Sequence, residues 1–79
     1  MNNLEAYNNA FKEAFDIEEK ELAGLEYHGT ANWDSVGHMN LISAIEDAFD
    51  IMLETDDIID FTSYEKGKII LAKYDKNIG

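Results

Sequence analysis

The chain has 79 residues with 17 acidic side chains, 6 lysines and no arginine, which gives a net charge of -11. This charge excludes nucleic acid and anionic membrane surfaces as direct ligands, because both are themselves negatively charged. With 46% hydrophobic residues and no cysteine, the sequence predicts one small globular domain, residues 1–79, without disulfides or thiolate metal sites.

No segment of the sequence predicts a membrane or secretory destination. The N-terminal residues lack the basic region and apolar run of a signal peptide. No apolar stretch approaches the ~20 residues that cross a bilayer. We therefore expect a cytoplasmic monomer with no membrane insertion.

The first predicted element is an amphipathic helix over residues 3–16. Its apolar side chains recur at steps of three and four residues, at Leu4, Tyr7, Phe11, Ala14 and Phe15. Residues 17–33 lose this spacing and are predicted to form a loop, of a length that is usually functional. Four large side chains are expected to hold this loop against the core, namely Leu22, Leu25, Tyr27 and Trp33.

The second helix is predicted from Asp34 or Ser35, both good N-cap residues, to about Asp50. Apolar residues fall on one side, which we expect to face the core: Val36, Met39, Ile42, Ile45 and Phe49. Three further apolar residues widen this stripe, namely Leu41, Ala48 and Met52. Polar residues fall on the opposite side, at Asn40, Ser43, Asp47 and Asp50, with Glu46 at its flank.

Two more helices are predicted in the C-terminal third. A short one covers residues 56–61 with Thr55 as its cap. A capping box at Thr62 and Glu65 predicts the start of the last helix, which ends near Asp75. No segment alternates with the period of a strand. The predicted fold is therefore all-α, a small bundle of three main helices plus one short helix.

The sequence contains no recognisable set of catalytic residues, so we expect no enzyme activity. His28 and His38 lack the ligand spacing of a metal site, and the acids from Glu54 to Asp60 lack the spacing of an EF-hand, so no metal site is expected. The segment between Lys20 and Lys66 holds acidic residues and no basic one. It suits either a solvated surface or a docking face for basic proteins.

Ser35 is notable for its position, because it follows the long loop and begins a helix. Asp-Ser is ordinary N-capping chemistry, and on position alone capping is the simpler interpretation. The same helix terminus would also stabilise a phosphate group carried on the Ser35 hydroxyl, since its amides are unpaired and partly positive.

The run Trp33-Asp34-Ser35-Val36-Gly37-His38-Met39-Asn40-Leu41-Ile42 resembles the Asp-Ser-Leu attachment motif of acyl carrier proteins, with valine in place of the leucine. The resemblance continues through residues 45–50, Leu53, Asp56-Asp57 and Thr62-Ser63, and so covers the whole length. It implies that Ser35 is the attachment point for 4′-phosphopantetheine, taken from coenzyme A. Cargo would then travel as a thioester on this arm.

The resemblance further implies a non-catalytic carrier of acyl or aminoacyl groups in fatty-acid, polyketide or other specialised biosynthesis. The implied partners are a phosphopantetheinyl transferase, an acyl- or aminoacyl-loading enzyme, and downstream acyltransferases or synthases. The residues expected to bind them are Asp34, Val36, Met39, Glu46 and Asp47. The sequence also leaves open an acidic helical adaptor that binds a basic partner without a cofactor.

Overall fold

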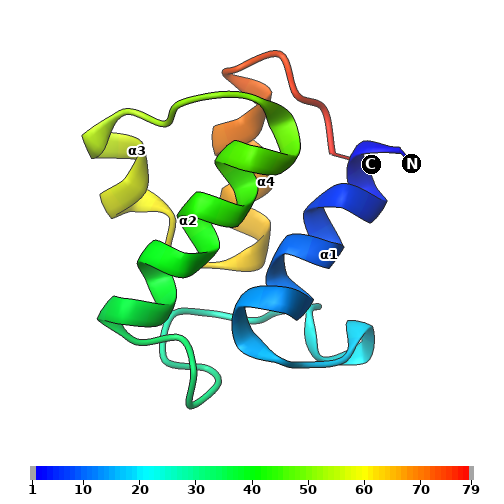
Figure 1. Cartoon of the computed structure of the whole chain (residues 1–79), viewed down its shortest axis with the longest axis vertical. Coiled ribbons are helices and arrows are strands. Elements are labelled where there is room, and N and C mark those ends of the chain that lie inside the picture. Colours follow the sequence, from blue (N-terminus) through cyan, green and yellow to red (C-terminus); the bar gives the residue numbers. More distant parts are fainter. Residues whose placement is uncertain (1, 79) are drawn as a thin grey trace.

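A computed structural model describes residues 2–78, within which the chain forms four α-helices: α1 (Asn3–Phe15), α2 (Ser35–Phe49), α3 (Thr55–Asp60) and α4 (Tyr64–Ala72). A single 3-10 turn, η1 (Glu19–Glu21), lies in the segment between α1 and α2. α1 and α2 pack against each other and run in opposite directions (Figure 1). The all-α bundle predicted from the sequence is thereby confirmed. None of the helices described is both long enough and apolar enough to cross a membrane.

The first helix forms where its apolar spacing predicts it. The Asn2 side chain caps α1 by accepting a hydrogen bond from the Glu5 amide at 2.8 Å. The helix ends at Asp16, which adopts the left-handed conformation with φ of 54°. One face of α1 is buried, at Tyr7, Ala10, Phe11 and Phe15.

The buried face of α2 differs in part from the predicted one. Ile42, Ile45 and Phe49 are buried as expected, and so is Leu41. Ala48 and Met52 were expected to widen this face, but both are exposed. Val36 and Met39 are instead 71% and 52% exposed. The reason is geometric, because each step of three residues rotates a side chain by about 60° less than a full turn. Three such steps from Ile45 back to Val36 therefore lead to the opposite side of the helix.

The starts of α3 and α4 each lie one residue from the predicted positions. Thr55 is the first residue of α3 and not its cap; the cap position belongs to Glu54, whose side chain makes no capping bond. The cap of α4 is Ser63 and not Thr62: the Ser63 hydroxyl accepts from the Lys66 amide at 2.9 Å. Thr62 stays outside the helix because its carbonyl accepts a hydrogen bond from the Tyr27 amide at 2.9 Å.

An aromatic cluster forms the centre of the core. The Phe11 ring lies 5.9 Å from Phe15, 5.6 Å from Trp33 and 6.2 Å from Phe61, measured between ring centroids. These rings come from α1, from the loop before α2 and from the residue after α3. The loop is held to the core as predicted at Leu22, Leu25 and Trp33, which are buried. Tyr27 is the exception, because it is 36% exposed and lies at the surface.

The short helix α3 is held against the end of α4 by a buried carboxylate. Asp57 is 6% exposed and accepts hydrogen bonds from the Lys73 ammonium at 2.5 Å and the Tyr74 hydroxyl at 2.6 Å. The Tyr74 hydroxyl in turn accepts from the Glu54 amide at 3.0 Å. These two hydrogen bonds lower the pKa of Asp57 below its ordinary value, and the bond from Lys73 has the larger effect. We call Asp57, Lys73 and Tyr74 the carboxylate clamp.

The clamp predicts an acid-dependent loss of stability. A carboxylate whose pKa is lowered by folding stabilises the native state above its unfolded-state pKa, and this contribution disappears as pH falls through the folded-state pKa. We expect the difference in free energy of unfolding between the parent and Asp57→Asn to be largest near pH 7 and to shrink below about pH 4. Urea titrations across this range measure it. Asp47→Asn is the control, because it removes one negative charge from an exposed part of α2. If Asp57→Asn changed the free energy of unfolding by the same amount at pH 7 and at pH 3, the result would contradict the clamp.

Candidate functional site

Asp34 and Ser35 have separate roles at the start of α2. The Asp34 carboxylate accepts from the Gly37 amide at 2.8 Å, so Asp34 is the N-cap. Ser35 is the first helical residue, and it is exposed. The Ser35 hydroxyl is therefore not needed for capping. The sequence alone did not decide which of the two residues is the cap.

The loop before α2 crosses close over the first turn of the helix. A Cβ atom at Gly37 would overlap the carbonyl of Asn32, so only glycine fits at this position without a shift of the backbone. The Asn32 side chain also donates to the Phe15 carbonyl at the end of α1, at 2.8 Å. These contacts fix the path by which the chain enters α2, and with it the position of Ser35.

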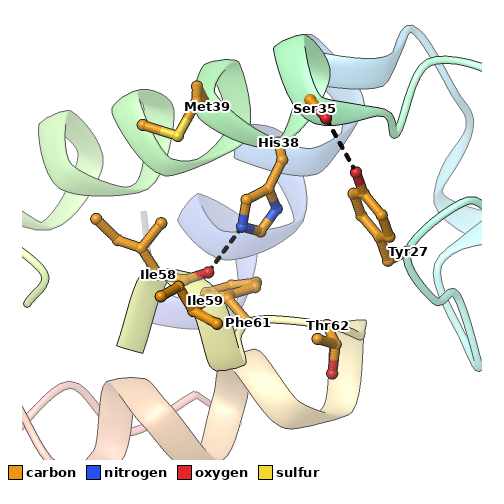
Figure 2. Close-up of a pocket in the computed structure, with 8 residues that line it drawn as sticks. All are labelled: Tyr27, Ser35, His38, Met39, Ile58, Ile59, Phe61 and Thr62. Carbon is orange, nitrogen blue, oxygen red and sulfur yellow. Dashed lines mark hydrogen bonds between the residues drawn. The ribbon is translucent and has the colours of Figure 1, made fainter. Parts of the chain in front are cut away.

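A hydrogen-bonded chain links the loop, α2 and α3. The Trp33 indole Nε1 lies 3.0 Å from Nδ1 of His38, and Nε2 of His38 lies 2.8 Å from the Ile58 carbonyl oxygen (Figure 2 draws the second bond). An indole N–H can only donate and a carbonyl can only accept. His38 must therefore accept at Nδ1 and donate at Nε2, which assigns a neutral ring with its hydrogen on Nε2. We call Trp33, His38 and Ile58 the imidazole bridge.

A pocket of about 460 Å³ lies between α2 and α3 and begins at Ser35. Figure 2 shows Ser35, His38 and Met39 on the α2 side, facing Ile58, Ile59 and Phe61 across it. Tyr27 and Thr62 complete the lining. The walls are mainly hydrocarbon, with the hydroxyls of Ser35, Tyr27 and Thr62 near one end. The pocket can accept an apolar group whose polar end lies near Ser35.

The Ser35 hydroxyl has a polar neighbour in Tyr27. The two hydroxyl oxygens are 3.4 Å apart, and either can be the donor. This distance is longer than the usual O–H···O bond, so the contact in the unmodified protein is weak.

The structure separates the expected partner-binding residues into two groups. Asp34, Val36 and Met39 surround or follow Ser35 within the first turns of α2, and all three are exposed. Glu46 and Asp47 lie about 16–18 Å further along the helix axis. Asp47 is exposed, whereas Glu46 is half-buried and accepts a hydrogen bond from the Leu53 amide at 2.9 Å. Glu46 therefore also fixes the connection between α2 and α3.

Sequence reasoning did not identify most of the residues around Ser35. Tyr27 was expected to hold the loop against the core, whereas it lies at the surface and lines the pocket together with His38. His38 could have been found from spacing, since it follows Ser35 by three residues and so lies on the same side of α2. Ile58 and Ile59 reach the site only through tertiary packing. Within residues 2–78, no group of three or more His, Cys, Asp or Glu side chains is placed to hold a metal ion.

The imidazole bridge makes a prediction about His38. Nitrogen-15 NMR of the neutral imidazole should show the hydrogen on Nε2. His38→Phe should lower the free energy of unfolding by about 1–3 kcal/mol, because the buried indole N–H and the Ile58 carbonyl each lose a partner. His28→Asn is the matched control: His28 is exposed with φ of 69°, which asparagine tolerates, and the change should stay within about 0.5 kcal/mol. The opposite tautomer, or full stability of His38→Phe, would rule out the bridge.

Comparisons with known proteins add no assignment to this geometry. No protein-family model matches the chain, and searches of curated proteins and of solved structures return no match either. A small helical bundle does not by itself specify a function, so the function has to come from the residues around Ser35.

Proposed function

We propose that this protein is a carrier of acyl or aminoacyl groups, and that Ser35 holds a 4′-phosphopantetheine arm derived from coenzyme A. The observation that supports this most directly is the exposed Ser35 hydroxyl, released from capping by Asp34, at the first position of a 15-residue helix and at the end of an apolar pocket. The Asp-Ser motif that resembles acyl carrier proteins falls at the same place.

The start of α2 suits a phosphate group on Ser35. The first amides of a helix have no partner inside the helix, and together they carry a partial positive charge. Asp34 engages the amide of Gly37, which leaves those of Ser35 and Val36 for an anion. The negative charge of the Asp34 carboxylate repels a phosphate on Ser35. The hydrogen bond that this carboxylate accepts from the Gly37 amide reduces the repulsion. The residues present therefore fit the group.

Attachment needs only the nucleophilic oxygen of this chain. The Ser35 Oγ atom forms a bond to the phosphorus of coenzyme A next to the pantetheine, the phosphoanhydride bond breaks, and 3′,5′-ADP leaves. The hydroxyl proton passes to a base of the transferase. The bound arm supplies a thiol, which this cysteine-free chain lacks. We assign no catalytic role to any residue of the carrier itself.

The surface around Ser35 suits brief contacts with several enzymes. Val36, Met39 and Ile59 are exposed apolar residues near the pocket. The acidic residues closest to them in sequence are Asp34 at the cap of α2 and the exposed Asp56 and Asp60 of α3. Exposed apolar side chains provide contact area, and the acidic charge steers basic partners to the surface. Such partners are the transferase, a loading enzyme, and the acyltransferases or synthases that receive the cargo. The apolar pocket can shelter a hydrocarbon part of that cargo.

The test is loading in vitro. The protein is incubated with coenzyme A and a phosphopantetheinyl transferase of broad specificity, and its intact mass is measured. We expect the mass of one phosphopantetheine group to be added to the parent, none to Ser35→Ala, and one to the matched control Ser43→Ala, which alters an exposed serine of the same helix. Ser35→Ala should remain folded, because Asp34 and not Ser35 is the cap.

Two outcomes would contradict the proposal. Loading of Ser35→Ala would place the modification elsewhere in the chain. A folded parent that several transferases fail to load would favour the cofactor-free acidic adaptor instead.

A further inference from the structure

We propose that Tyr27 is a positioning residue for the modified serine: its hydroxyl donates a hydrogen bond to a phosphate oxygen on Ser35. The bond would hold the phosphate on the Tyr27 side of Ser35, where the pocket begins. This inference rests on the proposed function, because it requires that Ser35 carries a phosphodiester. It concerns a residue of the long loop, outside the motif that suggested the modification.

The contact between Tyr27 and Ser35 changes character when Ser35 is modified. In the unmodified protein the two oxygens are 3.4 Å apart, and both hydroxyls can donate (Figure 2). Attachment of phosphorus removes the hydrogen from the Ser35 oxygen. Tyr27 then holds the only hydrogen of this pair, and it faces a group with charged acceptor oxygens. Hydrogen bonds to charged acceptors are shorter and about twice as strong as those between neutral groups.

Other side-chain donors are scarce around Ser35. The sequence has no lysine or arginine between Lys20 and Lys66. His38 is the nearest histidine on α2, but both of its ring nitrogens are engaged in the imidazole bridge. Tyr27 is the side chain with a polar contact to the Ser35 hydroxyl. It is therefore the best-placed side-chain donor for a phosphate at this position.

The backbone at Tyr27 is held in place before any ligand arrives. Its amide donates to the Thr62 carbonyl at 2.9 Å, and the neighbouring residue Glu26 forms an antiparallel bridge with Ser63. The Tyr64 amide donates to the Leu25 carbonyl at 2.8 Å. Three consecutive loop residues are thus fixed to the start of α4.

The ring of Tyr27 is also confined by its aromatic neighbours. It meets the His28 ring edge-on at 4.1 Å and the His38 ring at 5.8 Å between centroids. With the side chain 36% exposed, its hydroxyl can still reach a group on Ser35. A donor that is already ordered loses little entropy when it binds.

The experiment compares the effect of loading on stability in three proteins. The parent, Tyr27→Phe and Thr62→Val are each prepared with and without the phosphopantetheine group, and loading is verified by intact mass. Urea titration gives the unfolding equilibrium constant of each form. Thr62→Val is the matched control, because it removes another hydroxyl from the same pocket. Phosphorus-31 NMR of the loaded proteins gives a second measurement.

We expect loading to favour the folded state roughly tenfold more in the parent than in Tyr27→Phe, which is the effect of a hydrogen bond to a charged group. Thr62→Val should behave like the parent. The phosphorus resonance should move in Tyr27→Phe and stay in place in Thr62→Val.

The outcomes distinguish this inference from the proposed function. Equal effects of loading in the parent and Tyr27→Phe, with an unchanged phosphorus resonance, would remove the role of Tyr27 and leave the carrier function intact. If Tyr27→Phe and Thr62→Val reduced the stabilising effect of loading by the same amount, the inference would also be overturned. The effect would then belong to any hydroxyl of the pocket and not to Tyr27 in particular. A parent that cannot be loaded would overturn both.

Discussion

The burial of Trp33 is the constraint on which the site depends. Its side chain is fully buried, with the ring stacked on Phe15 at 5.0 Å, so its indole N–H cannot be satisfied by water. His38 provides the acceptor at 3.0 Å. Because His38 follows Trp33 by little more than one helical turn, this bond fixes the start of α2 relative to the core. Ser35 lies between the two residues, and so its position follows from the same bond.

The same interaction sets the position of α3 and hence the pocket. A helix of six residues is too short to be stable alone, so contacts outside it must hold α3 in place. The imidazole bridge holds it from the α2 side through the Ile58 carbonyl, and the carboxylate clamp holds it from the α4 side through Asp57. The width of the pocket beside Ser35 thus depends on polar bonds at both sides of α3.

Local sequence pattern predicts the helices better than the site. The spacing of Tyr7, Phe11 and Phe15 is enough to predict α1, because helical periodicity is a property of neighbouring residues. The prediction that Val36 belongs to the buried face of α2 is wrong, because residues spaced three apart shift steadily around the helix. The contact of His38 with Ile58 joins residues that are 20 positions apart, and that of Tyr27 with Ser35 requires the loop to fold back on α4. No local pattern contains such contacts.

The central claim is that Ser35 carries a phosphopantetheine arm when the protein is at work. The most direct measurement is peptide mass spectrometry of the protein isolated from its own cells, rather than loaded in vitro. The proposed function predicts that the peptide containing Ser35 bears phosphopantetheine, free or with an acyl or aminoacyl group on its thiol. A folded protein recovered with Ser35 entirely unmodified, under conditions in which the protein is active, would contradict it.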